Sequence, residues 1–171
     1  IYTLEDLHKN THLLNNKQKI GLRNYDDLNK RIPRSEITTF KKFIQQLIKN
    51  KFNGDIQITI TGSYRRGNKN SGDIDMLIIS QQYKNKALSL LLKELKEELI
   101  IKDILASGKK KFMGIIQFPN LPARHLDIIE TSIKEYPFAI LYFTGSGPFN
   151  IMMRKKAIDL GYSLNEYNIT Y

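Results

Sequence analysis

The sequence contains no cysteine, and this absence removes three classes of chemistry together. A disulfide framework, a thiolate zinc site and a cysteine nucleophile all require that residue. The fold must therefore be stabilised by packing alone. With 41% hydrophobic residues the chain has the composition of a globular protein. A chain of 171 residues can bury a sizeable core, on the order of 70% of its unfolded surface.

Long apolar runs and targeting signals are also missing. No run of about 18 apolar residues, the length that crosses a bilayer as a helix, occurs in the sequence. The start, Ile1–Asp6, has neither an initiator methionine nor the apolar centre of a signal peptide. No internal repeat or low-complexity tract is present. We therefore expect a soluble chain that is a fragment of a longer protein and has no membrane partner.

Acidic residues are scarce relative to basic ones. The 17 Asp and Glu residues face 27 Lys and Arg residues, which leaves a formal net charge of +10. This excess favours a polyanionic partner, because each neutralised phosphate releases a condensed counterion. Nucleic acid is the leading candidate, and an acidic membrane surface, which the same charge would also fit, is the second and is not the partner that we expect. The heavy use of Lys, Asn and Ile could also reflect an AT-rich genome, and that alternative stays open.

The first part of the chain is predicted to be helical. Residues 4–25 are polar with scattered apolar positions, which favours short helices over strands. Pro33 biases Ile32 away from the helical region, so an element boundary is expected there. Apolar residues then recur at helical spacing and predict a long amphipathic helix with Ser35 as its N-cap and its end near Asn53–Gly54.

The rest of the chain alternates strand-like and helix-like patterns. Strands are expected at 56–60, 73–79, 100–105, 112–118 and 125–129, and helices at 88–99, 136–143 and 148–160. Because the strands are gathered between helices, the predicted fold class is α+β with a small sheet.

Two carboxylates stand together at the opening of a predicted strand. Asp73 and Asp75 flank Ile74, so both side chains leave the same face of the strand. Unpaired, they would repel each other and shift each other's pKa, and a divalent cation relieves that cost. Taken alone, the pair also fits a polar turn at a strand entry. Asp127 occupies a polar position of another predicted strand, so a third carboxylate could emerge beside them.

A phosphate-binding turn precedes this pair. Gly62–Gly67 supplies backbone N–H groups, a hydroxyl and two guanidinium groups around a glycine-bounded turn. Three carboxylates and such a turn suit phosphoryl transfer with two metal ions.

These residues resemble a known family. Gly62-Ser63 at a strand end, followed by Gly72-Asp73-x-Asp75, is similar to the signature of the nucleotidyltransferase superfamily, which includes the palm of DNA polymerase beta. Further segments recur in the same order in family X DNA polymerases: Leu4–Leu7, Ile20–Leu22, Arg31–Arg34, Lys111–Gly114, Tyr142–Ser146, Phe149–Asn150 and Asn165–Tyr167. The resemblance implies a nucleotidyltransferase-type palm, with a small mixed sheet packed on two long helices and flanked by helical subdomains.

The resemblance also implies a division of the chain. Residues 1–33 would form part of a helical DNA-binding subdomain, 34–133 the palm with the catalytic carboxylates, and 134–171 part of a nucleotide-binding subdomain. The lyase domain of the family is not in this sequence, so lyase activity is not assigned to it. The sequence stops near Tyr171, before the closing half of the last subdomain, so we expect the isolated chain to fill gaps more slowly than the intact protein.

Roles for individual residues follow from the same resemblance. Asp73 and Asp75 would hold two Mg²⁺ ions, which Mn²⁺ could replace, and Asp127 would bind the catalytic one and help to activate the primer hydroxyl. The implied nucleotide contacts are Arg31, Ser63, Arg66, Gly72, Tyr142, Phe143, Gly145 and Asn150. The implied DNA contacts are Lys111, Arg124, His125 and Arg154.

Purely structural roles remain open for several of these residues. Tyr142 and Phe143 could be core aromatics, and Lys109–Lys111 could be a solvated turn. His125 could support Asp127 instead of facing DNA. His8 and His12 have helical spacing but no carboxylate joins them, so no zinc site is expected there.

The expected function is template-directed DNA synthesis. The chain would add a deoxynucleotide to a primer 3′ hydroxyl, filling short gaps during base excision repair, with gapped or primed DNA and dNTPs as partners. We expect a monomer, located in the nucleus if the source is a cellular eukaryote, with viral or organellar origins also open.

Three alternatives come from other classes of function. A nucleotidyltransferase for RNA ends or small molecules would need neither the basic balance nor the segment Tyr142–Asn150. A template-independent terminal transferase typically has two glycines where this chain has Gly62-Ser63. A catalytically inactive DNA-binding scaffold predicts the loss of at least one carboxylate, and none is lost.

From the net charge of +10 we predict that binding to duplex DNA weakens steeply as salt rises and varies little with base sequence, because phosphate contacts dominate. Fluorescence anisotropy with two unrelated duplexes, titrated between roughly 50 and 200 mM salt, measures both effects. A flat response to salt, or a strong preference for one duplex, would contradict the prediction.

Overall fold

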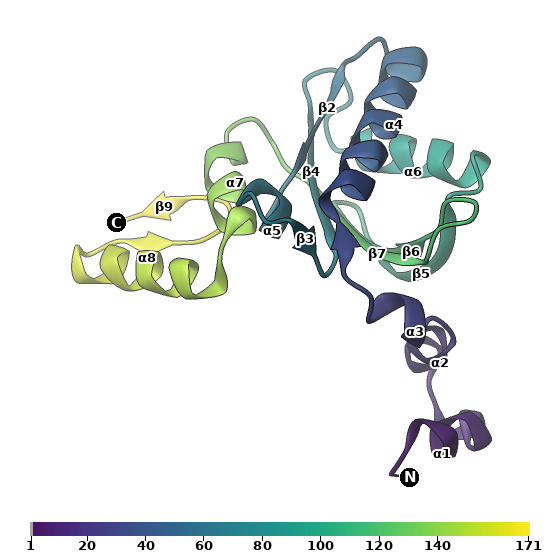
Figure 1. Cartoon of the computed structure of the whole chain (residues 1–171). Helices are drawn as coiled ribbons and strands as arrows, with labels where there is room; N and C mark the ends of the chain where they lie inside the picture. The colour runs from purple at the N-terminus through teal and green to yellow at the C-terminus, as the bar shows by residue number, and fades with distance from the viewer. Residues whose placement is uncertain (1) are drawn as a thin grey trace.

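A five-stranded mixed sheet forms the centre of the protein, in a computed structural model that describes residues 2–171 (Figure 1). In spatial order its strands are β2 (Ile56–Ile60), β4 (Ile74–Ser80), β7 (Arg124–Glu130), β6 (Lys111–Ile116) and β5 (Ile101–Ser107). β4 and β7 run parallel, and the other neighbouring strands are antiparallel. The predicted α+β class with a small mixed sheet is confirmed.

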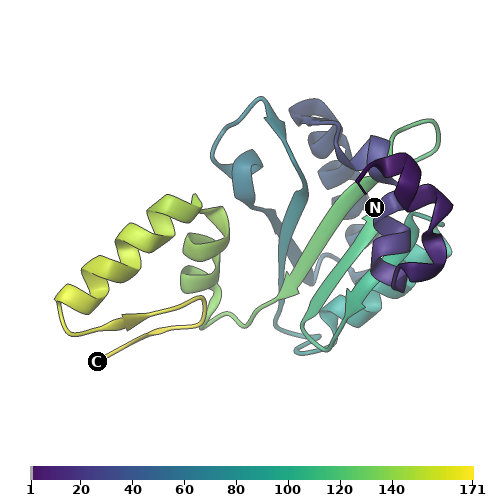
Figure 2. The same ribbon diagram turned by 90° about the horizontal axis from the view of Figure 1, so that it is seen from below.

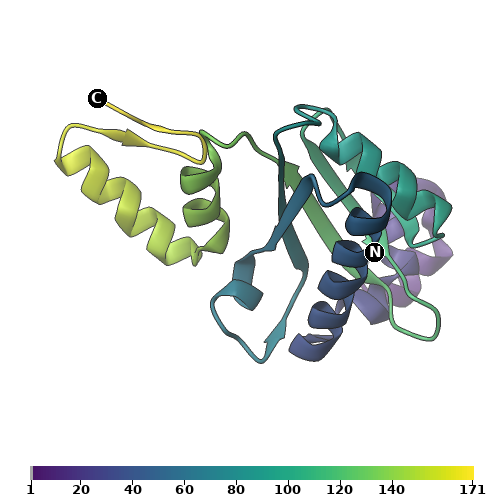
Figure 3. The same ribbon diagram turned by 90° about the horizontal axis from the view of Figure 1, so that it is seen from above.

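Two long helices cover one face of this sheet, as predicted. They are α4 (Arg34–Phe52) and α6 (Ala87–Glu97), which lie next to each other in Figures 1 and 3. Their buried residues recur at helical spacing: Ile37, Phe40, Ile44, Leu47, Ile48 and Phe52 in α4, and Ala87, Leu88, Leu91, Leu92 and Leu95 in α6. Each fully buried Leu or Ile side chain contributes about 1.5–3 kcal/mol, so these two stripes supply a large part of the core.

The ends of α4 agree only in part with the prediction. Ser35 is not the N-cap, because the helix already begins at Arg34, directly after Pro33. The start is set instead by β1 (Ile32–Pro33), which pairs with β3 (Asn70–Ser71). At the other end, Asn53 adopts a left-handed conformation with φ of 52° and its N–H donates to the Ile48 carbonyl, so the helix ends where expected.

The C-terminal unit and the N-terminal helices lie at opposite ends of the sheet (Figure 2). The former comprises α7 (Tyr136–Thr144), α8 (Gly147–Asp159), β8 (Ser163–Leu164) and β9 (Ile169–Thr170). The latter are α1 (Leu4–Lys9), α2 (Asn16–Arg23) and α3 (Tyr25–Leu28). The sequence did not predict β1, β3 or the β8–β9 hairpin, whereas the predicted longer elements end within two residues of the observed ends. Between residues 2 and 171, no helix combines the length and the apolar character that a bilayer crossing requires.

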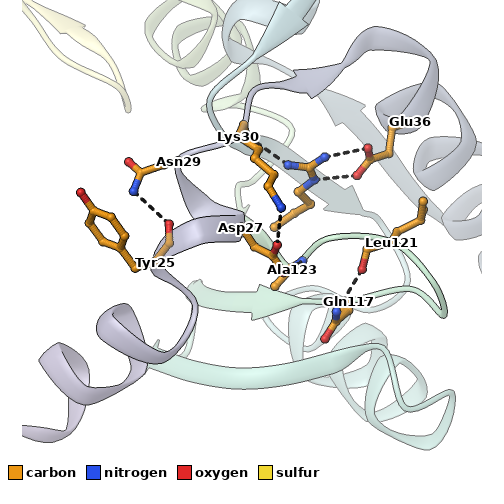
Figure 4. A network of polar contacts seen from close by, with 9 residues as sticks. Tyr25, Asp27, Asn29, Lys30, Glu36, Gln117, Leu121 and Ala123 are labelled. Carbon is orange, nitrogen blue, oxygen red and sulfur yellow. Dashed lines mark hydrogen bonds and ion pairs between the residues drawn. The ribbon is translucent and has the colours of Figure 1, made fainter. Parts of the chain in front are cut away.

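Arg124, predicted to contact DNA, is buried instead, with 6% of its surface exposed. Its Nε and Nη2 donate to the two carboxylate oxygens of Glu36 at 2.7 and 2.9 Å, and its Nη1 donates to the Lys30 carbonyl at 3.0 Å (Figure 4). The guanidinium therefore joins β7 to α4 and to the end of the helical segment. This enclosure speaks against a DNA contact by Arg124, which stays a prediction.

Polar contacts also attach the N-terminal helices to the sheet. The Asp27 carboxylate accepts the Ala123 N–H at 2.9 Å and pairs with Lys30 at 3.1 Å (Figure 4). The Ala123 N–H is the main cause of a lowered pKa at Asp27. The buried amide of Asn24 donates to Asp103 of β5 at 3.0 Å. Directional bonds, more than apolar packing, set the position of α2 and α3.

We predict that Arg124→Met destabilises the protein by about 3–5 kcal/mol, because it leaves the carboxylate of Glu36 without its buried partner. Urea denaturation measures the change. The matched control is Lys93→Met, which breaks the exposed Lys93–Glu97 pair and should cost less than about 1 kcal/mol. If Arg124→Met has normal stability but binds DNA more weakly, the result would instead support a DNA contact by Arg124.

Candidate active site

Strand pairing brings two of the predicted carboxylates together. In the parallel ladder of β4 and β7, Asp75 stands opposite Asp127. Side chains alternate along a strand, so the neighbours Ile74 and Met76 enter the core under the helices while Asp75 leaves the other face. Asp73 lies exposed just before the same strand. The open face of the sheet therefore carries a concentrated negative charge.

Burial and mutual repulsion perturb both paired carboxylates. Burial raises the pKa of Asp75 to about 7, and the charges of Asp73 and Asp127 act in the same direction. Burial also raises the pKa of Asp127, against the influence of His125 and Lys111. His125 Nδ1 lies 3.5 Å from Asp127 Oδ1. Two of the predicted DNA contacts, Lys111 and His125, thus act on the carboxylates themselves.

Gly62 allows the turn before the carboxylates to approach them closely. Its φ is 55°, and a Cβ built on it would overlap Oδ2 of Asp75. The Thr61 N–H also donates to the Asp75 carbonyl at 2.8 Å. Any side chain at position 62 would displace Asp75, which explains the glycine at this place in the motif.

The turn itself is a one-turn helix, α5 (Gly62–Arg65), supported from beneath by α4. The Tyr64 hydroxyl lies 3.0 Å from Thr38 Oγ1. Arg34 stacks over the Tyr64 ring at 4.1 Å and donates from Nη1 to the Tyr64 carbonyl at 2.6 Å. With Tyr64 held inward, Ser63 and Arg66 are left on the cleft side.

The cleft has a volume of about 470 Å³ and lies between α5, the start of β4 and the α7–α8 junction. All eight residues that the resemblance implied as nucleotide contacts line it, together with Asp73 and Asp75. Gly147, which the resemblance places near the base, also lines it. Asn68 and Ser146 line it too and were not predicted, because nothing in a polar, glycine-rich stretch shows which side chains face inward. Tyr142 and Phe143 are half-buried cleft residues, not core aromatics.

Hydrogen bonds connect the two sides of the cleft. Arg66 Nη1 donates to the Thr144 carbonyl at 2.7 Å, and Arg65 Nη1 donates to the Thr144 hydroxyl at 3.2 Å. A further contact joins the start of α7 to the sheet, where the Tyr136 hydroxyl lies 2.8 Å from Thr59 Oγ1 of β2. The end of α7 is therefore tied to the turn that precedes the carboxylates.

The predicted residues of α8 contact their own unit. Asn150 donates its side-chain amide to the Tyr142 carbonyl at 2.8 Å. The Arg154 guanidinium lies 5.0 Å from the centre of the Tyr142 ring and pairs with Glu166 at 3.3 Å. A DNA contact by Arg154 stays a prediction.

Comparison with known proteins gives the family. A model described as DNA polymerase beta palm matches residues 31–133, more than half of the chain, and one described as DNA polymerase beta thumb matches residues 139–170. The chain belongs to the DNA polymerase beta family, family X. The family resemblance seen in the sequence is confirmed.

Individual family X relatives are similar over nearly the whole chain. DNA polymerase lambda of Rattus norvegicus is 34% identical over 177 residues, which covers 98% of this chain and 30% of the relative. DNA polymerase lambda of Arabidopsis thaliana is 31% identical, with coverages of 96% and 33%. DNA nucleotidylexotransferase of Xenopus laevis is 28% identical, with coverages of 91% and 38%. The chain thus spans about a third of the length of these curated relatives.

The carboxylates of this family X chain fit a hard divalent cation by their chemistry. Asp127 Oδ1 is buried and accepts no hydrogen bond, and its nearest cationic group is the His125 ring at 3.5 Å. Carboxylate oxygens are the ligands that Mg²⁺ prefers, and a cation would offset the repulsion among the three aspartates. In the described part of the chain, no three His, Asp or Glu side chains are already grouped closely enough to hold a metal. Mg²⁺ commonly takes only one or two carboxylates from a protein and completes its shell with water and substrate phosphates.

We predict that Asp75→Asn raises the melting temperature of the metal-free protein at about pH 8 and that this gain shrinks toward about pH 5. The folded-state pKa of Asp75 is about 7 against an ordinary value of 3.8, so its stabilising contribution is present at low pH and is lost as pH rises through about 7. Thermal denaturation in EDTA measures the effect, with Asp55→Asn in an exposed turn as the control. A variant no more stable than the parent at the higher pH would contradict the prediction.

Proposed function

We propose that the protein is a DNA-directed DNA polymerase that adds a deoxynucleotide to a primer 3′ hydroxyl and releases pyrophosphate. The observation that carries this proposal is the single cleft in which Asp73 and Asp75 share a wall with Ser63 and Arg66. Carboxylates for metal ions and guanidinium groups for phosphates are the two requirements of nucleotidyl transfer. The DNA polymerase lambda relatives support the same activity.

In this proposal Asp73, Asp75 and Asp127 hold two Mg²⁺ ions. Bound divalent ions neutralise a triphosphate and lower the pKa of the attacking hydroxyl. Asp127, which stands opposite Asp75 in the β4–β7 ladder, would bind the catalytic ion and help to activate the primer hydroxyl.

The remaining cleft residues bind and orient the nucleotide. Ser63, Arg66 and the backbone of Gly72 contact the phosphates, with Arg31 at the distal one, and the two guanidinium charges stabilise the pyrophosphate that leaves. On the opposite wall Tyr142, Phe143 and Gly145 line the sugar and Asn150 reaches the base edge. Alignment of hydroxyl and phosphate adds to this electrostatic stabilisation.

The substrate we propose is gapped or primed DNA, in short-gap filling during base excision repair. The net charge of +10 supports a nucleic-acid partner, and Lys111, His125 and Arg154 are the proposed DNA contacts. We also propose a monomer, a nuclear location if the source is a eukaryotic cell, and the subdomain division at residues 33 and 133.

A second candidate is template-independent addition, which the similarity to DNA nucleotidylexotransferase favours. The two activities differ in their need for a template. Extension of gapped and of blunt DNA by the full-length protein with Mg²⁺, each dNTP offered singly, separates them. Incorporation of only the complementary dNTP supports the polymerase, and addition of every dNTP to single-stranded primer supports the alternative.

We predict that Asp127→Ala lowers nucleotide addition by about a thousandfold, since losing a metal ligand removes several kcal/mol of transition-state stabilisation. The fold and the affinity for DNA should change little. Single-turnover extension, thermal melting and DNA binding measure the three quantities, with the exposed Asp55→Ala as control. Unchanged turnover in a folded Asp127→Ala would overturn the metal assignment.

A further inference from the structure

Arg31 enters the cleft from the residue before β1, and a single neighbour holds it there. Its Nε donates to the side-chain oxygen Oδ1 of Asn70 at 2.9 Å, and its Nη2 donates to the Asn70 carbonyl at 3.3 Å. Both residues are exposed, so no surrounding core restricts the arginine. A long side chain in solvent loses up to about 2 kcal/mol of rotamer freedom when it is fixed. The contact with Asn70 meets that cost before any ligand arrives.

Asn70 is itself held by the backbone. Pro33 pairs with Asn70 in the β1–β3 ladder, and the Arg34 N–H donates to the Lys69 carbonyl at 2.9 Å. The next residue, Ser71, is buried and accepts a hydrogen bond from the Ser63 hydroxyl at 2.7 Å. One short strand therefore sets the position of Arg31 and of the phosphate turn together.

The hydrogen bonds to Asn70 leave part of the guanidinium available. Arginine has five N–H donors in a rigid fork, and Asn70 takes one from Nε and one from Nη2. Nη1 lies over Gly72, where a Cβ would come within 3.2 Å of it, and Gly72 leads directly into Asp73. The unused donors thus lie beside Gly72, one residue before the carboxylate proposed to hold a metal ion.

An amide at position 70 orients the arginine without neutralising it. Among residues 2–171, Arg31 has no carboxylate within ion-pair distance, so its charge is uncompensated. We infer that Asn70 is a positioning residue, which presents the charged fork of Arg31 to the terminal phosphate of the incoming triphosphate. This inference rests on the proposed function, in which Arg31 contacts that phosphate.

Steady-state gap filling by the full-length protein tests the inference with three variants, Asn70→Ala, Arg31→Ala and the double variant. A hydrogen bond to a charged group is worth about 1.5–3 kcal/mol, and here part of it is replaced by water, so Asn70→Ala should raise the KM for dNTP by about 3- to 10-fold. The kcat and the affinity for gapped DNA should change by less than about twofold. In the Arg31→Ala background, Asn70→Ala should have no further effect on KM.

Asn70→Asp separates positioning from a structural role. The aspartate keeps an acceptor for Nε but neutralises the arginine, so KM should rise at least as much as in Asn70→Ala while the melting temperature is preserved. A purely structural role predicts that the aspartate restores the parental KM. Asn50→Ala is the matched control, because Asn50 is exposed on α4 and, among residues 2–171, its side chain bonds only to Gln46.

The outcomes separate a failure of the positioning role of Asn70 from a failure of the proposed phosphate contact of Arg31. If Arg31→Ala leaves the KM for dNTP unchanged, the proposed phosphate contact of Arg31 fails. If Arg31→Ala raises KM but Asn70→Ala does not, or if the two effects add, only the role of Asn70 is overturned. Asn70→Asp serves as the deciding variant should Asn70→Ala melt early.

Discussion

The parallel pairing of β4 with β7 creates a repulsion between carboxylates that the rest of the structure has to offset. It sets Asp75 against Asp127 on a half-buried face, where two negative charges are costly, and Asp73 adds a third close by. The stabilising free energy that offsets this cost comes from the opposite face of the sheet, where the buried stripes of α4 and α6 pack on the strands. A well-packed core on one side of a thin sheet thus supports a destabilised cluster on the other.

Neighbouring elements are arranged around these charges. Arg66 and Lys111 supply positive charge from two separate segments, and both lower the pKa of Asp75 against the effect of burial. Asp75 occupies the space that a side chain at position 62 would need, so only glycine fits there. The turn that carries Gly62 and Arg66 has little core of its own, so it takes its rigidity from the contact of its Tyr64 with Arg34 of the underlying helix α4. Rigid elements therefore hold the polar groups of the cleft.

Sequence reasoning succeeded where one periodicity spans a whole element. The stripes of α4 and α6 and the alternation in β4 are of this kind, and the Asp-x-Asp spacing placed two carboxylates on one face. It failed where partners are distant in the chain. Arg124 faces Glu36 across 88 positions, and no local pattern shows that its charge is enclosed. Asn70 was missed because the two-residue strand that presents it exists only through pairing with β1.

The bond from Arg66 to the Thr144 carbonyl gives the cleft a thermodynamic property. The same guanidinium lines the space proposed for the phosphates, so a ligand that draws it away weakens the tie to α7, and a shift of α7 changes what Arg66 can offer a ligand. By linkage, each event alters the free energy of the other by an equal amount. Occupancy of the cleft and the placement of the C-terminal unit are therefore coupled equilibria.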